Sequence, residues 1–232
     1  IVSNFATAQT IKLGVRGGTF SPISLYEALA KKNPGSEQSS FSTSRPYSLS
    51  LGASVEKQRW LFGANSSIRR IDIRQSYNDS FFPSNSFFET YDFDISVGYK
   101  VVQTPTSSLN AIVGLGVQTR YDYISNSLTY SEILPDSSIE IVRLKSEIKP
   151  VSKVPVFLLL KLEGEFSLSN RWSTFFTIES NLFLGRNYYL RDTYTYEYKG
   201  ETINQYNDGV RFSNNSISST LGFRYALFKS NS

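Results

Sequence analysis

The sequence predicts an all-β protein, an eight-stranded antiparallel up-and-down transmembrane β-barrel with long extracellular loops and short periplasmic turns. Eight segments alternate apolar and polar residues with the period of two that a β-strand imposes. On that phasing almost every charged residue of the eight segments falls on one face. The last segment, Ile217–Phe228, places an apolar, aromatic-rich face opposite Arg224. A buried arginine is costly in the core of a small soluble sheet but natural in the polar lumen of a membrane barrel.

Composition narrows the class further. The chain has 232 residues, enough for one domain, with 15 Tyr and 17 Phe. Cysteine and histidine are both absent, which excludes disulfides, thiolate nucleophiles and the commonest general base. The net charge of +4 arises from scattered residues and not from a basic run, which argues against nucleic-acid binding. No apolar stretch is long enough for a transmembrane helix, so a membrane location requires a closed barrel.

The first four predicted strands lie in the N-terminal half of the chain. They are Thr10–Thr19, Tyr47–Glu56, a segment that starts at Trp60, and Tyr91–Val101. In the third of these the alternation changes phase near Arg70 and Ile71, which predicts a β-bulge there.

The last four predicted strands are Leu109–Tyr123, Val156–Leu168, Trp172–Leu184 and Ile217–Phe228. All eight strands are at least as long as the roughly 9–11 residues that a tilted strand needs to cross a bilayer. We expect Leu49, Leu115, Leu160, Ile178 and Leu221 to face lipid, and Arg16, Asp94, Arg120, Glu163 and Arg224 to point inward. A soluble ligand-binding barrel would reverse the two sets.

The connections alternate in length, as outer-membrane barrels require. The short ones are 57–59, 103–108 and 169–171, and the long ones are 20–46, 74–90, 123–150 and 185–216. An even number of strands places both termini and the short turns on the periplasmic side. We divide the chain into an N-terminal tail (1–9), the barrel (10–228) and a C-terminal tail (229–232). Within the first tail, Ala6-Thr7-Ala8 is either a signal-peptidase site or a chance triplet in a short periplasmic segment.

Aromatic residues gather near the ends of the predicted strands. Trp60 and Trp172 each follow a short turn, and Tyr99 and Tyr225 approach the same rim. The other rim carries Tyr47, Tyr91, Phe93, Tyr121 and Tyr123. Two girdles of this kind are expected where amphipathic rings meet lipid headgroups.

Parts of the long loops also have structural patterns. Ser24–Lys32 has the spacing of two helical turns. Leu128–Leu134 and Ile139–Ile148 flank a turn signal, as do Tyr188–Tyr198 and Thr202–Phe212. We expect these pairs to continue strands five to eight beyond the membrane.

Few residues suggest chemistry. Asp92 with Asp94, and Glu163 with Glu165, share a face, so each pair could hold a cation or do acid–base work. The alternative, which we favour, is a lumen ion-pair network with the inward cations Lys12, Arg16, Arg69, Lys100, Arg120, Lys161 and Arg224. The tyrosines of the last loop could stack on sugars or dock a partner, or pack within their own hairpin; they are Tyr188, Tyr189, Tyr194, Tyr196, Tyr198 and Tyr206. We expect no catalytic, cofactor-binding or metal-ligating residue, no cofactor and no enzymatic activity.

The chain resembles small outer-membrane β-barrels of the PorT-like type and is similar in architecture to the eight-stranded OmpX and OmpA barrels. The resemblance rests on the strand pattern, the girdles and a C-terminal insertion signal formed by Thr220, Gly222, Tyr225 and Leu227. It implies the outer membrane of a Gram-negative bacterium and favours a role in secretion. It carries over no catalytic residue.

Our functional hypothesis is an accessory subunit of a larger outer-membrane assembly for secretion, insertion or uptake, with a side-chain-filled lumen that does not conduct. The expected partners are outer-membrane lipid or lipopolysaccharide and other outer-membrane proteins, with no nucleic acid. One alternative is a freestanding structural or adhesive protein. A second is an outer-membrane hydrolase that uses carboxylates at the extracellular rim.

Overall fold

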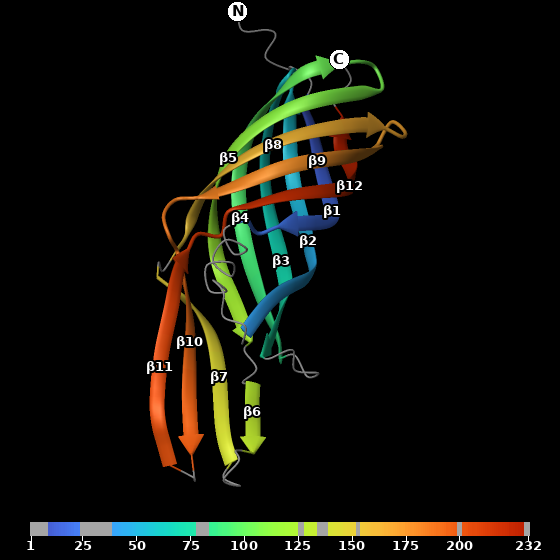
Figure 1. Ribbon diagram of the computed structural model, residues 1–232. Coiled ribbons are helices and arrows are strands. Elements are labelled where there is room, and N and C mark those ends of the chain that lie inside the picture. Colours follow the sequence, from blue (N-terminus) through green and yellow to red (C-terminus); the bar gives the residue numbers. More distant parts are fainter. Residues whose placement is uncertain are drawn as a thin grey trace, which may run out of the picture.

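The computed structural model describes residues 9–23, 39–77, 84–124, 128–133, 139–151, 154–198 and 201–229, and it contains the predicted barrel (Figure 1). Eight strands close in the order β1-β12-β9-β8-β5-β4-β3-β2, and all neighbours are antiparallel. Their bounds are β1 (Gln9–Ser21), β2 (Ser39–Lys57), β3 (Trp60–Tyr77), β4 (Ser84–Gln103), β5 (Ser107–Ile124), β8 (Val156–Ser167), β9 (Trp172–Phe183) and β12 (Ser216–Lys229). No helix among the described residues is long and apolar enough to cross a membrane.

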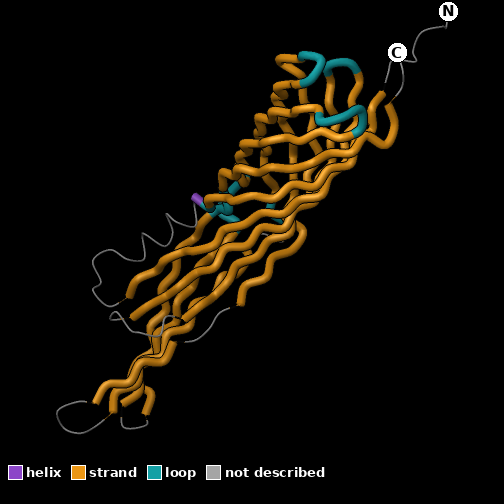
Figure 2. Tube along the Cα trace, turned by 90° about the vertical axis from the view of Figure 1, so that its right-hand side faces the viewer, coloured by secondary structure: helices purple, strands orange, loops and turns teal. Residues whose placement is uncertain are grey.

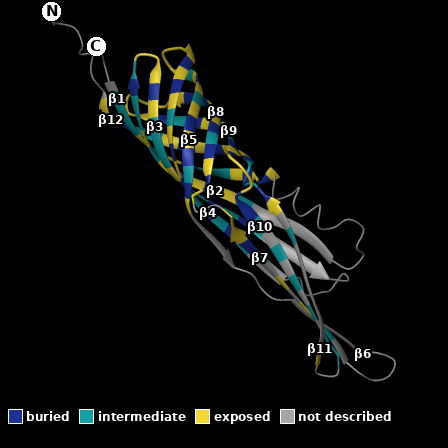
Figure 3. Cartoon of the chain, turned by 90° about the vertical axis from the view of Figure 1, so that its left-hand side faces the viewer, coloured by how far each residue is buried: buried dark blue, intermediate teal, exposed yellow. Residues whose placement is uncertain are grey.

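The barrel strands face as predicted, with apolar residues outside and charged residues inside. Buried and exposed residues alternate along these strands (Figure 3). The five residues predicted to face lipid are 44–57% exposed; they are Leu49, Leu115, Leu160, Ile178 and Leu221. Arg16, Asp94 and Glu163 are buried, and Arg224 is ion-paired to Glu163. Arg120 lies opposite Tyr91 on β4, and its side chain is outside the described part of the structure. This is the arrangement of a transmembrane barrel and the reverse of a soluble one.

The bulge predicted near Arg70 and Ile71 lies at the predicted height but on the neighbouring strand, because the pairing of β2 with β3 shifts opposite Ile71 and the extra residue is on β2. Ile71 is fully buried and continues the inward series of Ser67 and Arg69, and the pairing of β3 with β4 passes Ile71 without a shift. The register shift lies on the neighbouring strand β2, between Ser44 and Tyr47. Pro46 lies within that shift and has no N–H to give to the ladder. The alternation only seemed to slip because Ile71 is an apolar residue on the lumen face.

Four barrel strands, β2, β3, β4 and β5, extend beyond the apolar belt as a wall. β2 begins at Ser39, β3 runs to Tyr77 and β4 begins at Ser84, so parts of two predicted long loops are strand. β1 leaves β2 after the pair Gly18 and Ser48, and the upper part of β2 pairs with β3. The predicted helical turns at 24–32 and the triplet at 6–8 lie outside the described residues.

A second sheet stands beyond the barrel on the other side of the mouth. Its strands are β6 (Leu128–Ile133), β7 (Ile139–Pro150), β10 (Tyr188–Tyr198) and β11 (Glu201–Phe212), in the order β11-β10-β7-β6. The predicted strands therefore exist, but they pair with one another and do not continue the barrel ladder. The pairing of β5 with β8 ends at Val117 and Val156, and Gly185 turns the chain between β9 and β10 with a φ of 88°. We call this unit the protruding sheet.

The two ends of the molecule differ. The short turns, the start of β1 and the end of β12 lie at one end of the barrel, and the protruding sheet extends from the other (Figures 1 and 2). The short turns join β2 to β3, β4 to β5 and β8 to β9.

Candidate functional site

The lumen is filled with charge. Among the described residues, twelve charged side chains turn inward, and their charges balance. The six cations are Lys12, Arg16, Arg69, Lys100, Lys161 and Arg224, and the six carboxylates are Glu56, Asp92, Asp94, Glu163, Glu165 and Glu179. They come from β1, β2, β3, β4, β8, β9 and β12 through the alternation of each strand.

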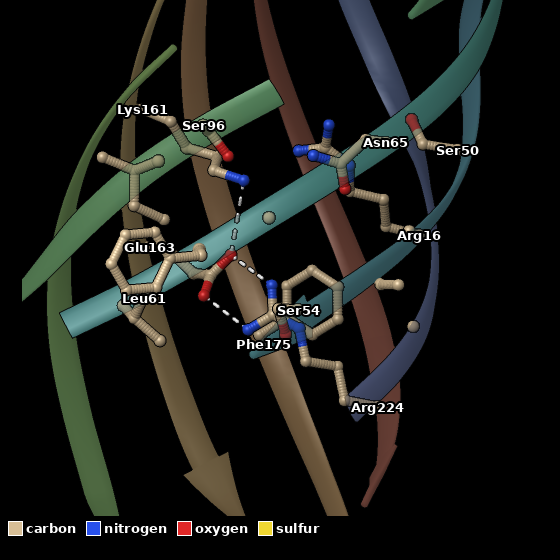
Figure 4. Close-up of a pocket in the computed structure, with 16 residues that line it drawn as sticks. Arg16, Ser50, Ser54, Leu61, Asn65, Ser96, Lys161, Glu163, Phe175 and Arg224 are labelled. Atoms are coloured by element: carbon tan, nitrogen blue, oxygen red, sulfur yellow. Dashed lines mark hydrogen bonds and ion pairs between the residues drawn. The ribbon is translucent and has the colours of Figure 1, made fainter. Parts of the chain in front are cut away.

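The centre of the network is Glu163 on β8 (Figure 4). Its carboxylate accepts from Arg224 Nη1 and Nη2, with N···O distances of 2.5 and 2.7 Å. Asn110 Nδ2 donates to the same carboxylate at 3.2 Å, and Lys161 Nζ lies 3.8 Å away. The Arg224 guanidinium also lies over the Phe175 ring, 4.0 Å from its centroid. The side chain of Glu163 is 1% exposed, accepts hydrogen bonds from β12 and β5, and lies beside a lysine of its own strand.

A second group of ion pairs lies toward the short turns. Lys12 Nζ is 2.6 Å from both Glu56 and Glu165, and Lys100 Nζ is 2.8 Å from Glu56. Beyond these pairs a polar cavity of about 310 Å³ opens at the short-turn end. It is lined mainly by Ser, Thr, Asn and Gln side chains of the turns and strand ends.

A third group lies toward the other end of the lumen. Arg16 Nη1 is 2.5 Å from Glu179, and Arg69 contacts both Glu179 and Asp92 at 3.4 Å. Asp94 accepts a hydrogen bond from Asn65 at 2.9 Å. Four of these five charged residues are less than 5% exposed.

These contacts favour the ion-pair interpretation of the paired carboxylates. Glu163 and Glu165 both contact Arg224, Asp92 contacts Arg69, and Asp94 is hydrogen-bonded to an amide. In the described part of the chain, no group of three or more Asp, Glu, His or Cys is arranged to hold a metal ion. The structure supports the ion-pair network.

The remaining space in the lumen is small. The cavity at its centre has a volume of about 30 Å³ and is bordered by Arg16, Asn65, Lys161, Glu163 and Arg224. A single water needs roughly 10–15 Å³ of such volume. The cavity at the centre therefore has room for about two or three waters.

An apolar plug, which the sequence analysis missed, closes the mouth of the barrel below the protruding sheet. Tyr188, at the base of β10, is fully buried. Its ring centroid lies 5.3 Å from that of Phe88 on β4 and 5.5 Å from that of Phe212 on β11, and its hydroxyl donates to Gln118 on β5. Other buried apolar residues are Phe20, Ile71, Ile148, Phe157, Leu159 and Phe183. The available signal was the break in alternation that Ile71 and Phe88 introduce.

Aromatic pairs mark the short-turn rim, as predicted. Trp60 packs against Tyr99 with ring centroids 5.3 Å apart, and Trp172 packs against Tyr225 at 5.0 Å. Arg171 donates to the Tyr225 hydroxyl at 2.9 Å.

The opposite rim has exposed aromatics followed by a charged cluster. Tyr47 and Phe93 are 45% and 44% exposed. Tyr91 donates to Glu89, and Arg70 lies 3.9 Å from that carboxylate. The side chains of Tyr121 and Tyr123 are outside the described part. The exterior thus changes from aromatic to charged at this height.

Comparisons with known proteins give a fold likeness and no family. No family model matches the chain, and no curated protein matches its sequence. Among solved structures, the transport unit of the autotransporter AIDA-I from Escherichia coli is 12% identical, with a TM-score of 0.33 over 97% of this chain and 92% of that one. The outer membrane protease OmpT from Escherichia coli is 9% identical, with a TM-score of 0.37 over 95% and 96%. The toluene transporter TodX from Pseudomonas putida is 9% identical, with a TM-score of 0.26 over 94% and 89%. Their activities are properties of those proteins.

Proposed function

We propose that this chain is a non-enzymatic outer-membrane barrel of a Gram-negative bacterium that serves as an accessory subunit of a larger outer-membrane assembly. The observation that carries the proposal is the protruding sheet. Within the described part of the chain, β11 pairs with β10 alone and β6 with β7 alone. Each outer strand thus has an edge to which a partner strand could add.

The exterior of the barrel supports the membrane location. The apolar side chains of the belt remain exposed, at 44–57% for the five residues predicted to face lipid. Aromatic pairs border the belt at the short-turn rim. An exposed apolar surface of this extent is stable in lipid and a liability in water. The PorT-like resemblance of the sequence favours a secretion assembly among the three named.

The closed lumen favours a role in binding a partner over a role in transporting solutes. Ion pairs fill the barrel from the short turns to Arg69, and the apolar plug lies over them. An interior filled by side chains leaves no path for general solutes. The parts of the molecule that remain available for function are its exterior and the protruding sheet.

The register of the protruding sheet supports a protein partner. Tyr194 pairs with Leu144 on one side and with Tyr206 on the other, and Tyr196 pairs with Val142. Aromatic and aliphatic residues thus occupy neighbouring register positions across three strands. Such residues are enriched at protein interfaces.

Affinity purification from native membranes in mild detergent tests the proposal. We expect stoichiometric co-purifying proteins with the full chain. They should be lost when 195–205 is replaced by an Asn-Gly turn, which joins the paired residues Tyr194 and Tyr206 and keeps the register. Arg171→Gln, at the opposite end of the barrel, is the matched control and should keep the partners. A clean monomer from the full chain would contradict the proposal and favour the freestanding structural or adhesive protein.

The enzyme alternative finds little support at the described rim. Arg70 lies 3.3 Å from Asp72 and 3.9 Å from Glu89, so these carboxylates are ion-paired. A rim-carboxylate hydrolase requires convergent carboxylates that are free to exchange protons. We therefore keep the non-enzymatic role as the proposal.

A further inference from the structure

One face of the protruding sheet is strongly basic. It carries five cations and two carboxylates, a net charge of +3 among the described side chains. We call this set the basic face; it consists of Arg143, Lys145, Lys149, Arg191 and Arg211 with Glu147 and Glu197. The sheet register places all seven on one side, since Lys149 pairs with Tyr189, Tyr189 with Arg211, and Glu147 with Arg191.

The basic face points away from the barrel mouth. The neighbours of its lowest row, Ile148, Tyr188 and Phe212, are all buried, and Tyr188 contacts the apolar plug. Because successive side chains of a strand alternate in direction, Lys149 and Arg211 turn to the exterior. Lys149 is 51% exposed at its side chain.

The lowest row lies next to the apolar exterior of the barrel. Val151 and Val154 follow Lys149 along the chain and are 51% and 55% exposed, and Leu184, just past the end of β9, is 63% exposed. The backbone N–H of Val151 donates to the carbonyl of Asn187, one residue before β10, which fixes this junction. Lys149 and Arg211 are therefore the first charges of the basic face beyond the belt, and the exposed Arg186 lies just before them, in the turn between Leu184 and Asn187.

Internal ion pairs leave the basic face with a surplus of positive charge. Lys145 and Lys149 share Glu147 at 2.7 and 2.9 Å, and Arg143 lies 3.1 Å from Glu197. Hydrogen bonds from the two lysines hold the pKa of Glu147 at about 2, below its ordinary value.

The wall on the other side of the mouth has the opposite balance. Its described charged cluster pairs one cation, Arg70, with the carboxylates Asp72 and Glu89. Among the side chains that the structure describes, the surplus of cations is therefore found on the protruding sheet.

We propose that the basic face binds the phosphate groups of lipid headgroups in the outer leaflet, of the phosphorylated lipid A class. The inference rests on the membrane placement given under the proposed function. The apolar belt takes the acyl chains, and the row of Lys149, Tyr189 and Arg211 lies where the headgroup phosphates begin. Lysine and arginine form charge-assisted hydrogen bonds to phosphate, and a tyrosine between them suits the headgroup region. Because the basic face lies directly next to the apolar belt, a lipid is a better candidate ligand than a soluble polyanion.

Binding of defined lipids to the purified full chain in uncharged detergent tests this. The probes are diphosphoryl lipid A and the same lipid after enzymatic dephosphorylation, with inorganic pyrophosphate as competitor. We expect the protein to bind diphosphoryl lipid A but not its dephosphorylated form, with little competition from pyrophosphate. The double variant K149Q/R211Q should weaken the affinity by about 10- to 30-fold, since each basic residue near an anionic surface contributes about a factor of five. The control R70Q, on the opposite wall, should bind as the wild type does.

The contrary results are also distinct. Equal binding of the two lipids, or unchanged affinity in K149Q/R211Q, would overturn the proposal. Full competition by pyrophosphate would assign the face to soluble anions and overturn the lipid commitment. Heat-modifiable electrophoretic mobility verifies that each variant keeps a closed barrel. The 195–205 replacement keeps Lys149 and Arg211, so it separates loss of a protein partner from loss of lipid.

Discussion

The lumen and the basic face are both rich in charge, and they handle it in opposite ways. Among its described side chains, the lumen balances six cations against six carboxylates, and Glu163 at its centre is 1% exposed. The basic face has five cations against two carboxylates, with Arg143, Lys145 and Lys149 each more than half exposed at their side chains. Burial makes an unpaired charge expensive, whereas water screens one at the surface. A surplus of one charge is therefore tolerated only outside the barrel, where it can bind a ligand of the opposite charge.

The contrast between the lumen and the basic face should have its largest effect on the free energy of unfolding. Glu163→Ala removes the shared partner of Arg224 and Lys161, and we expect it to lower the free energy of unfolding by about 3–5 kcal/mol. Glu197→Ala, which breaks the exposed pair with Arg143, should cost no more than about 1 kcal/mol. Urea unfolding in detergent, followed by the fluorescence of Trp60 and Trp172, measures both. Similar costs for the two variants would mean that the lumen is more hydrated than its geometry indicates.

A slightly smaller effect is expected where the lumen meets the protruding sheet. Tyr188→Ala empties a fully buried site beside Phe88 and Phe212, so it should cost about 3 kcal/mol. Tyr188→Phe loses only the hydrogen bond to Gln118 and should cost about 0.5–1.5 kcal/mol. Hydrogen exchange of β10 should rise mainly in the alanine variant. Unchanged exchange there would show that the plug does not hold the sheet.

Planar-bilayer recording complements this pair of variants. We expect no stable, large single-channel conductance from the wild type, and none from Tyr188→Ala, because the ion pairs of Arg16 and Arg69 lie below the plug. Large steps from the wild type would refute the closed lumen. Steps from the alanine variant alone would assign closure to the plug and not to the ion pairs.

A smaller effect is expected at the short-turn rim, which lies far from both charged regions. Trp172→Ala loses the ring contact with Tyr225 and should lower stability by about 0.5–1.5 kcal/mol beyond its loss of apolar area. Trp172→Phe keeps an aromatic ring and is the matched control. The two unfolding curves in lipid vesicles give the difference. If the alanine variant is as stable as the phenylalanine variant, the contact between Trp172 and Tyr225 does not anchor the barrel.

The sequence was sufficient for the barrel because lipid enforces a simple rule. Leu49 and Leu115 are exposed while Arg16 and Glu163 are buried, and alternation alone separates such residues. This alternation rule fails at the mouth of the barrel, beyond the apolar belt, where lipid no longer surrounds the strands. Ile71, Phe88 and Tyr188 are apolar residues on the inner side, so the period of two assigned the bulge to the strand of Ile71, whereas the extra residue is on β2.

The protruding sheet was only partly predictable. Its strands could be recognised, but whether β7 pairs with β8 or with β10 depends on contacts distant in sequence. The basic face had a local signal, since Arg143, Lys145 and Lys149 recur at even spacing on one strand. That signal gains meaning only once β10 and β11 add Arg191 and Arg211 to the same side.

The smallest expected effect sharpens the comparison within the basic face itself. The pKa of Glu147 is about 2 because Lys145 and Lys149 donate to its carboxylate. Since this value lies below the ordinary 4.5, the stabilising contribution of the carboxylate is present above about pH 4.5 and is lost as the pH falls toward 2. Glu147→Gln removes that negative charge at neutral pH and raises the net charge of the face to +4.

We therefore expect Glu147→Gln to bind diphosphoryl lipid A about twofold to fivefold more tightly at pH 7, with Glu89→Gln on the opposite wall as the control. Tighter binding would show that surplus charge governs the face, in contrast to the lumen, where loss of a carboxylate is destructive. Weaker binding would show that Glu147 holds Lys145 and Lys149 in position for phosphate. In that case paired charges would be positioning devices at the surface as they are inside the barrel.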